Sequence, residues 1–505
     1  MSVQIVWFKR DLRLFDHHPL AEAAQHGAII PLYIIEPDLW QQPDTSARQW
    51  RFVRQCLVEL DGELHKRSGS GLVLRVGDAV EVLSKLHAEY GQIVLWSHEE
   101  TGNAWTFARD RAVAAWAQQA GVVWHEYRQD GVIRRLATRN AWAEHWARFM
   151  RDAPASVPDS LQFIKLESSP MPEASPWFVA PDTCPNAQAG GRSHGLRLLD
   201  SFLRVRGINY AKGMSSPLTA ESACSRLSPH LAYGTVSMRE VVQACDKRKH
   251  DAPPGWGRAL SAFASRLAWQ SHFMQKLESE PALEFVNLHP ALRQSRQVVD
   301  LALFGAWANG QTGYPLIDAC MRMLQASGWI NFRMRAMLSA FACYHLWQPW
   351  REVGLHLARL FIDYEPGIHW SQMQMQSGST GINAFRIYNP IKQSHDQDPD
   401  GHFIRRWLPE LANVPAEWIH EPWRLTPALQ QRYGCMIGTD YPHPIIEHEH
   451  AARQARERLH QAYKGGESKA SSREVLAKHG SRKKRAPTPR KSAAAVNHAQ
   501  MALFE

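Results

Sequence analysis

The fold of this chain is decided by three pieces of sequence: GWINFRMRAMLSAF (Gly328–Phe341), WREVGLHLARLFIDYEPGIHWSQMQMQSGSTGINAFRIYNP (Trp350–Pro390) and GHFIRRWLPEL (Gly401–Leu411). The first piece spaces its apolar residues as a helix does. The second is rich in Gly, Ser and Gln and carries arginines and carboxylates. This contrast predicts helix ends gathered around a large, partly polar ligand.

Length and cysteine content indicate the class of protein. A chain of 505 residues is too long for one compact core, so at least two domains are expected. The 7 cysteines include no CxxC pair, which fits free thiols in a reducing cytoplasm and gives no support for an iron–sulfur cluster or another metal site. No apolar run is long enough for a membrane span, and no basic region precedes an apolar core at the start. We expect a cytoplasmic protein without membrane association.

The net charge of +9 is concentrated at one end of the chain. Residues 464–505 hold ten Lys/Arg and three Asp/Glu, so they account for +7 of it. Arg482-Lys483-Lys484-Arg485, followed by prolines, is typical of a solvated, disordered extension. The charge therefore gives only weak support for a nucleic-acid partner of the folded body, and we expect a basic, disordered tail over 464–505.

Apolar runs and helically spaced stretches alternate through residues 1–150. The apolar runs are Ile5–Phe8, Ile29–Ile35, Leu72–Val76, Ile93–Trp96 and Val122–Tyr127. The helical stretches are Leu20–His26, Ala47–Lys66, Val80–Tyr90 and Trp105–Ala120. This alternation predicts an α/β domain with a parallel, doubly wound sheet, whose ligands would bind at the carboxyl ends of the strands. No GxGxxG or P-loop motif follows a strand, which argues against a dinucleotide fingerprint or a P-loop.

The rest of the chain is predicted to be helical. Residues 151–195 are rich in Pro, Ser and Ala and predict a long interdomain linker. Residues 196–463 space their apolar residues three and four apart and predict an all-α domain. Its expected helices include Leu196–Val205, Met238–Cys245, Gly257–Leu277, Leu316–Ala326 and Ile330–Trp347.

Two polar motifs interrupt these helices. Ser228 followed by Pro229 predicts a helix N-cap with proline at N1. Such a motif is either a capped helix or, together with Arg226, a phosphate site at a helix N-terminus. GQTGYP (Gly310–Pro315) leads into a further helix and by itself could be only a loop.

Taken together, the motifs resemble the DNA photolyase/cryptochrome superfamily. The segments VWFKRDLRLFDHHPL, SRLSPHLAYG, WANGQTGYPLIDACMRMLQASGW, WRE, FRIYNP and FIRRWLPEL follow its order over nearly the whole chain to about Trp423. The resemblance implies an α/β antenna domain and an all-α domain that holds FAD in a bent conformation. It also implies blue-light chemistry, in which the excited reduced flavin passes an electron to a pyrimidine photoproduct in DNA and later regains it.

The same resemblance assigns the cofactor site. The implied FAD-binding residues are Tyr210, Cys224, Ser225, Arg226, Leu227, Ser228, Phe263, Gln270, Asn331, Arg335, Asp363 and Glu365. Hydroxyls and helix N-termini suit the pyrophosphate, although Cys224 stands where relatives have threonine. A buried reduced isoalloxazine favours a nearby cation, and Arg335, paired with Asp363, is that cation by resemblance. The first domain is implied to hold an antenna chromophore (folate, deazaflavin or a second flavin) or nothing.

Electron supply is where the chain departs from its relatives. Relatives relay electrons to flavin through three tryptophans, and Trp307 and Trp350 match the two outer positions. The position nearest flavin is Met373, so Trp329, Trp347 or Trp370 would have to provide a bypass. His369 stands where repair enzymes usually carry an asparagine facing flavin N5.

The expected substrate pocket also differs from that of the related repair enzymes. Arg266 stands where enzymes that repair cyclobutane dimers usually have glutamate, and Trp269 keeps a base-stacking position. An arginine cannot share a proton as a carboxylic acid does, but it can stabilise a radical anion or bind phosphate. Phe332 and Ala336 occupy the positions of the two histidines of (6-4) enzymes.

Three functions are compatible with these residues. The first is light-driven repair of damaged DNA by a monomer, with cyclobutane dimers favoured and Arg333, Arg386, Arg405 and Arg406 along a phosphate track. The second is a cryptochrome-like photoreceptor that signals through a flavin redox change. The third is a flavoprotein without a light role.

Overall fold

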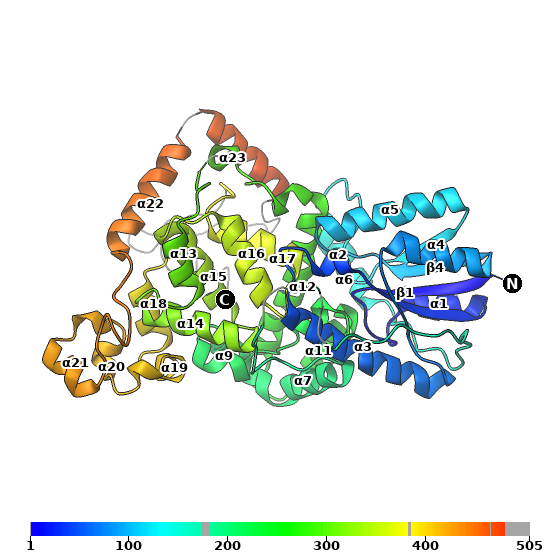
Figure 1. Ribbon diagram of the computed structural model, residues 1–505, viewed down its shortest axis with the longest axis horizontal. Helices are drawn as coiled ribbons and strands as arrows, with labels where there is room; N and C mark the ends of the chain where they lie inside the picture. Colours follow the sequence, from blue (N-terminus) through cyan, green and yellow to red (C-terminus); the bar gives the residue numbers. More distant parts are fainter. Residues whose placement is uncertain are drawn as a thin grey trace.

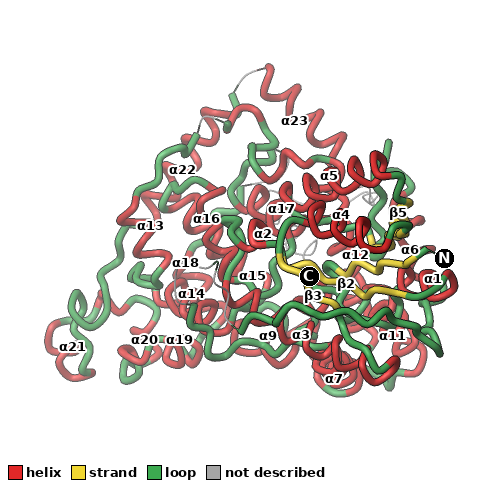
Figure 2. The backbone as a smooth tube through the Cα atoms, turned by 45° about the vertical axis from the view of Figure 1, so that its right-hand side comes forward, coloured by secondary structure: helices red, strands yellow, loops and turns green. Residues whose placement is uncertain are grey.

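The computed structural model describes residues 2–173, 177, 182–293, 295–381, 385–464 and 466–479. A parallel sheet with its helices forms one end of the molecule, and the remainder is helical (Figure 1). Figure 2 shows the same division, with the strands gathered on one side. The predicted order of an α/β part followed by an all-α part is confirmed. None of the described helices is long and apolar enough to cross a membrane.

The sheet has five parallel strands in the order β3-β2-β1-β4-β5. They are β1 (Val3–Phe8), β2 (Ile29–Ile35), β3 (Val73–Val76), β4 (Ile93–His98) and β5 (Val123–Tyr127). All of β2 is buried, as expected of a strand covered on both faces. Because β1 lies between β2 and β4, the chain changes direction across the sheet beside β1, where ligand sites of such sheets form. The doubly wound prediction is confirmed.

Helices cover both faces of this sheet. They are α1 (His18–His26), α2 (Pro37–Trp40), α3 (Ala47–Ser68), α4 (Ala79–Tyr90) and α5 (Ala104–Ala120), whereas α6 (Trp142–Arg151) packs against helices of the helical part. Val6 and Phe8 pack with α1 and α3 on one face, whereas Ile5 and Trp7 pack with α4 and α5 on the other. Successive side chains of a strand point to opposite faces, so a continuous apolar run serves two cores.

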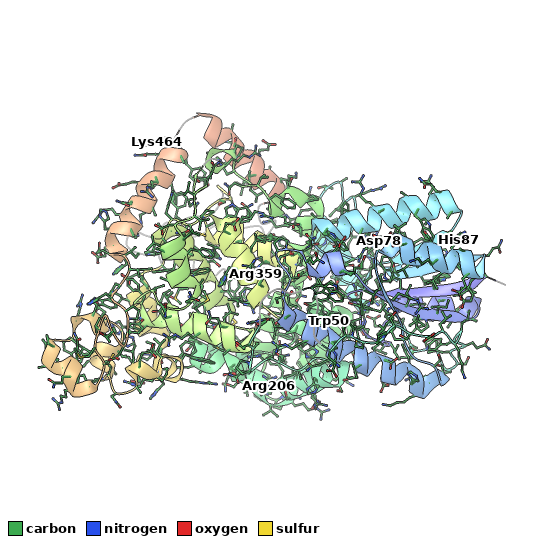
Figure 3. All side chains as sticks on the ribbon, viewed as in Figure 1. Trp50, Asp78, His87, Arg206, Arg359 and Lys464 are labelled. Carbon is green, nitrogen blue, oxygen red and sulfur yellow. The ribbon has the colours of Figure 1, made fainter. Side chains whose placement is uncertain are left out.

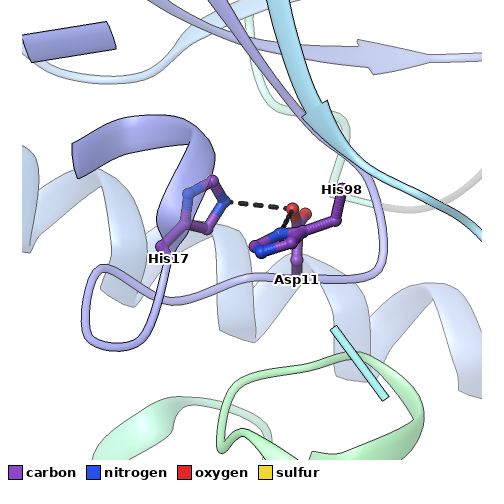
Figure 4. A group of neighbouring side chains, drawn as sticks. All are labelled: Asp11, His17 and His98. Carbon is purple, nitrogen blue, oxygen red and sulfur yellow. Dashed lines mark hydrogen bonds and ion pairs between the residues drawn. The ribbon is translucent and has the colours of Figure 1, made fainter. Parts of the chain in front are cut away.

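A buried cluster fixes the loop after β1 (Figure 4). Asp11 Oδ2 accepts hydrogen bonds from His17 Nε2 at 3.0 Å and His98 Nδ1 at 2.7 Å. Its other oxygen accepts the Lys9 backbone N–H at 2.7 Å. His17 Nδ1 accepts the Leu20 N–H and caps α1, so the proton of His17 is on Nε2. Burial acts to raise the pKa of Asp11, but His17 and His98 outweigh it and hold that pKa well below its usual range.

The ligand-type atoms of Asp11, His17 and His98 lie within 4.8 Å of one another, a spacing at which a metal ion can bind. The hydrogen bonds already occupy the Asp11 carboxylate and the ring nitrogens that face it. We therefore interpret the cluster as a structural connection between β1, α1 and β4.

The helical part begins with α7 and continues to the last described residue. Its α-helices are α7 (Arg192–Arg204), α8 (Tyr210–Gly213), α9 (Pro217–Ala223), α10 (Ser228–Ala232), α11 (Met238–Asp251), α12 (Gly257–Ser279), α13 (Leu301–Ala308), α14 (Pro315–Ser327), α15 (Phe332–Ala340), α16 (Trp350–Leu360), α17 (Pro366–Gln376), α18 (Pro390–Gln397), α19 (His402–Trp407), α20 (Ala416–Ile419), α21 (Pro427–Tyr433), α22 (His448–Ala462) and α23 (Gly466–His479). Trp50 of α3 lies where the two parts meet (Figure 3), in an apolar cluster that includes Tyr233 and Ile362.

The GQTGYP motif has a structural role. The Asp318 carboxylate of α14 accepts the backbone N–H groups of Thr312 and Gly313 at 2.8 and 3.0 Å, and the Tyr441 hydroxyl at 2.6 Å. Gly313 has a φ of 77°, and a Cβ there would lie 2.4 Å from the His443 backbone. The motif is thus a loop that one buried carboxylate holds against a later segment.

Two helix predictions need correction. Ser228 is not an N-cap, because α10 begins at Ser228 itself and Leu227 occupies the cap. Ser225 Oγ accepts the Leu227 N–H at 3.4 Å, and the Leu227 carbonyl already accepts from Leu231, so the first turn closes one residue early. The helix expected over Ile330–Trp347 is α15 followed by a π-helical turn, Phe341–His345. Apolar spacing does not distinguish these two kinds of turn.

The predicted linker lies along the sheet domain. Phe163 pairs with Ile29 of β2, and hydrogen bonds join Ile29 to the Gln162 carbonyl and Ile164 to the Ile29 carbonyl. Further along, Asp182 pairs with Arg48 of α3 at 2.6 Å. The linker prolines Pro176 and Pro181 lie outside the described residues.

The sequence predicts disorder over residues 464–505, but Gly466–His479 form a helix, α23. The Tyr463 hydroxyl, just before it, donates to the Gly378 carbonyl at 2.7 Å. Ser472 Oγ of α23 contacts His289 Nε2 at 3.1 Å, which places the helix beside the core of the helical part (Figure 1). Residues 480–505, with the basic run, lie outside the described residues.

Asp11→Ala should destabilise the sheet domain. The change removes the acceptor of two buried imidazole N–H groups, which should cost about 2–5 kcal/mol. Thermal unfolding followed by circular dichroism measures the effect. Glu63→Ala on α3 is the matched control, because its pair with Lys66 is exposed, and we expect no measurable change. Equal melting temperatures for the two variants would contradict a structural role for the cluster.

Candidate functional site

A partly buried ion pair stands at the centre of the helical part. Arg335 of α15 donates to both carboxylate oxygens of Asp363, at 3.0 and 2.7 Å. Its Nε donates to the Ile330 carbonyl at 2.7 Å, and the guanidinium lies 4.0 Å from the centre of the Phe361 ring. The Arg335 side chain keeps 23% exposure whereas Asp363 keeps 3%, so the cation presents an open side to a ligand. The predicted pair is thus formed.

The predicted phosphate turn follows α9. Cys224 caps the C-terminal end of α9, and Arg226 has a φ of 63°, a left-handed conformation that costs energy for a residue other than glycine. The Arg226 guanidinium lies 3.9 Å from the Trp329 ring centre, and its Nη1 has no hydrogen-bond partner among the described residues. Leu227 is buried, and the half-buried Ser225 and Ser228 flank it. The turn therefore holds a strained arginine with spare donor capacity.

A third group lies along α12. Phe263, Arg266 and Gln270 are spaced three and four apart and so share one face with neighbouring Trp269. The Arg266 guanidinium lies 4.6 Å from the Trp269 ring centre. Tyr210 of α8 packs edge-on against Phe263 at 5.8 Å. Burial raises the pKa of Tyr210, whereas its hydrogen bond with Arg266 acts to lower that pKa.

Helix α17 carries the next predicted residues. Glu365 caps it by accepting the Gly367 N–H, and pairs with Arg10 of the sheet domain at 3.1 Å. His369 Nε2 lies 2.9 Å from the Gly354 carbonyl, which only accepts, so the proton is on Nε2 and Nδ1 is an acceptor. Burial lowers the pKa of His369 to about 4, so the ring is neutral at pH 7. Both oxygens of Glu365 thus have protein partners, which the sequence did not indicate.

In the part of the chain that the structure describes, the tryptophans expected to relay electrons do not form one continuous series of ring contacts. Trp350 and Trp370 meet edge to face at 5.9 Å between ring centres. Gly354 allows this contact, because a Cβ there would lie 2.6 Å from the Trp370 ring and 3.3 Å from Met373. Trp307, fully buried, has ring contacts with Phe304 and His356.

The other two bypass candidates lie elsewhere. Trp329 packs against Arg226, and Trp347 packs against Arg296 and Arg458. Of the three candidates, Trp370 is the one whose ring contacts Trp350.

Unsatisfied polar atoms near the ion pair fit a ligand such as FAD. Asn331 Nδ2 donates to the Met214 and Ser215 carbonyls at 3.1 and 2.7 Å, but its buried Oδ1 has no partner among the described residues. Arg333 Nε is likewise buried without a partner among the described residues, while Arg333 Nη2 donates to Ser215 Oγ at 3.4 Å. Buried polar groups are normally hydrogen-bonded, so orphaned atoms at Asn331, Arg333 and Arg226 match a polar cofactor. Arg333 and the 214–215 segment were not assigned to the cofactor from sequence.

A second site candidate lies between the domains, at the carboxyl ends of the strands. A cavity with about 80 Å³ of space for water-sized molecules is lined by aromatic residues and by ion pairs. Arg109 pairs there with Glu36 and Glu100, both at 2.5 Å. Burial raises the pKa of Glu36 to about 7, although Arg109 opposes the rise. This cavity is where a ligand of the first domain would be sought.

Comparisons with known proteins match both parts of the chain. Residues 4–141 match the DNA photolyase family and residues 263–461 match the FAD binding domain of DNA photolyase. A deoxyribodipyrimidine photo-lyase of Streptomyces griseus is 30% identical over 88% of this chain and 97% of its own length. A cryptochrome DASH of Natronomonas pharaonis is 30% identical over 88% and 98%. The crystal structure of a class III photolyase from Agrobacterium tumefaciens superposes with a TM-score of 0.81, at 28% identity, over 92% of this chain and 98% of that one.

Gly367→Ala should disturb the packing of α12 on α17. A Cβ at Gly367 would lie 2.6 Å from the Met274 Cα, and backbone cannot move aside cheaply. We expect a loss of about 1–3 kcal/mol in stability, the usual cost of overpacking. Gly257→Ala is the control, since nothing lies within 4 Å of its Cβ position in the first turn of α12. A melting temperature for Gly367→Ala equal to that of Gly257→Ala would show that the two helices can separate freely.

Proposed function

This chain belongs to the DNA photolyase/cryptochrome family, and we propose that it repairs pyrimidine photoproducts in DNA, cyclobutane dimers in particular, by light-driven electron transfer from reduced FAD. The observation that carries the proposal is the Arg335–Asp363 pair, whose cation keeps an open side next to unsatisfied polar atoms of Asn331 and Arg333. A cation there stabilises an anionic ring system that would otherwise be costly to bury.

We assign the chain's residues to parts of FAD as follows. Arg335 and Asp363 bind beside the ring system, with Asn331 as a further polar contact. Cys224 to Ser228, with Arg226 as the cation, hold the pyrophosphate, and Tyr210, Phe263 and Gln270 complete the cradle. When bound, reduced FAD supplies the electron that splits the photoproduct under blue light. His369, with its Nδ1 kept as an acceptor by the Gly354 carbonyl, suits a hydrogen-bond donor on the ring.

Substrate binding is assigned to the Arg266–Trp269 pair on α12. An indole offers a stacking surface for a base turned out of the helix, and an arginine beside it can bind phosphate or stabilise negative charge. On the phosphate track, Arg405 is already bound to the Asp400 and Val414 carbonyls at 2.6 and 2.8 Å. Arg406 has an exposed, weak pair with Glu221 and lies 5.3 Å from the Trp407 ring centre, so Arg406 can still bind phosphate.

A direct assay tests the proposal. Purified protein with reduced FAD is mixed with an oligonucleotide containing a cyclobutane dimer, illuminated with blue light and analysed by chromatography. We expect light-dependent restoration of the pyrimidines, and none in darkness. A (6-4) oligonucleotide run in parallel identifies the lesion class. If neither lesion is restored, the enzyme proposal fails.

Trp269→Ala should weaken dimer binding. Loss of one stacking platform costs about 1–3 kcal/mol, or roughly 5- to 150-fold in affinity. Fluorescence anisotropy of a labelled oligonucleotide measures it. Trp105→Ala on α5, another half-buried tryptophan, is the matched control and should bind as the unmodified protein does. Equal losses in the two variants would remove Trp269 from the site.

The alternative function is a cryptochrome-like photoreceptor. The specific observation in its favour is the C-terminal extension, in which Tyr463 and Ser472 reach Gly378 and His289 of the body. A redox change at the flavin could alter that contact and release the tail. Intact photoreduction without repair of either lesion is the result that would favour this function.

We also propose that Trp370 takes the place of the missing tryptophan at Met373, so that electrons reach the flavin site from Trp350 through Trp370. Trp370→Phe and Trp350→Phe should each slow photoreduction of oxidised bound flavin, followed by absorbance with an added thiol reductant. Trp347→Phe is the control, since its ring packs on Arg296 and Arg458. Met373→Trp in the Trp370→Phe background should restore the rate. Unchanged kinetics in Trp370→Phe would rule out this route.

A further inference from the structure

The segment Asp363–Glu365 connects the proposed flavin site to the other domain. Asp363 is bound to Arg335, as described above. The next residue, Tyr364, donates its hydroxyl to Asp44 Oδ2 of the sheet domain at 2.6 Å. Glu365 pairs with Arg10 of the sheet domain at 3.1 Å. One residue of the segment thus binds within the cofactor site, and the two after it bind the first domain.

Arg10 makes the most extensive of these contacts. Its Nε donates to the Ala232 carbonyl at 2.8 Å and its Nη2 to the Tyr364 carbonyl at 2.9 Å. Its guanidinium also lies 5.3 Å from the Tyr233 ring centre. A planar fork with five N–H donors can make all these contacts at once, which a lysine cannot.

The segment around Arg10 also packs closely against the helical part. Leu12 N–H donates to the Tyr233 carbonyl at 3.1 Å, and Arg13 Nη1 donates to the Gly234 carbonyl at 2.9 Å. Gly234 has a φ of 64°, and a Cβ there would lie 2.3 Å from the Arg10 carbonyl oxygen. The position of Arg10 is therefore fixed from both sides of the domain boundary.

The charge of Glu365 depends on this contact. Burial raises the pKa of Glu365 to about 7, and Arg10 is the main group that opposes the rise, whereas Asp130 and Glu100 add to it. Figures 1 and 2 both place α17, which Glu365 caps, at the boundary beside α2. Without Arg10, a buried carboxylate next to the flavin-binding segment would lose its cation.

We propose that Arg10 is a positioning residue of the flavin site, which holds the Tyr364–Glu365 backbone so that Asp363 stays bound to Arg335. FAD retention and the redox potential of the bound flavin then depend on the contacts that Arg10 and Asp44 of the sheet domain make with Tyr364 and Glu365. The proposal rests on the FAD site assigned above, but it requires neither light nor DNA.

The test compares Arg10→Gln with a second interdomain variant. Asp16 and Arg239 form an ion pair across the same boundary, with side-chain exposures of 2% and 3%, and neither is bonded to the 363–365 segment. FAD release in the dark is followed by the rise in flavin fluorescence, and the midpoint potential by dye equilibration. We expect Arg10→Gln to speed FAD release roughly 5- to 150-fold, the usual range of coupling between sites. It should also shift the midpoint potential.

The other variants separate positioning from general stability. Arg239→Gln should lower the melting temperature yet leave FAD release and the midpoint potential unchanged. Arg10→Lys, which keeps the charge, should restore the potential and part of the FAD retention. If Arg10→Gln does not fold, Tyr364→Phe, which removes the contact with Asp44, should speed FAD release in the same direction. Equal effects of Arg10→Gln and Arg239→Gln, or unchanged release in Arg10→Gln or Tyr364→Phe, would overturn the proposal. Repair activity plays no part in these measurements, so failure of the repair function would leave this result interpretable.

Discussion

Burial of charge is the constraint on which the rest of the structure depends. Taking a carboxylate or guanidinium out of water costs several kcal/mol unless a partner and hydrogen bonds compensate. The Arg335 guanidinium contacts the Ile330 carbonyl, the Phe361 ring and both carboxylate oxygens of Asp363. The sheet domain follows the same rule where Arg109 pairs with Glu36 and Glu100. Since each partner comes from a different element, these pairs also determine which elements are neighbours.

The arrangement of local elements could be predicted from sequence because it depends on short-range periodicity. The strand Ile29–Ile35 is predicted and observed with identical bounds, since a continuous apolar run between turns has few alternatives. The same reasoning failed where tertiary contacts decide. The helix start at Ser228 depends on a hydroxyl three residues before the expected cap, and α23 forms within a segment whose charge indicated disorder.

Part of the candidate site could also be predicted from sequence, and part could not. Arg335 and Asp363 could be assigned by resemblance, and the structure brings them together. The pairing of Arg10 with Glu365 could not, because those residues lie more than 350 positions apart. Trp370 was one of three bypass candidates, and ring geometry was needed to choose among them. Sequence thus indicates which residue types a site needs, whereas the partner of each residue is a property of the packed molecule.

Helix α22 and Tyr463 complete the apolar interior of the helical part. Ala455 and Leu459 of α22 are buried in one apolar cluster with Tyr344 and Leu292, and Phe385 packs against it. A chain shortened at the end of the family match, near residue 461, would retain these residues but would lose Tyr463 and its bond to Gly378. A chain that ends before α22 would expose an apolar surface and would be prone to self-association. Helix α22 therefore lines the apolar interior of the helical part, and Tyr463 connects the end of that helix to the body.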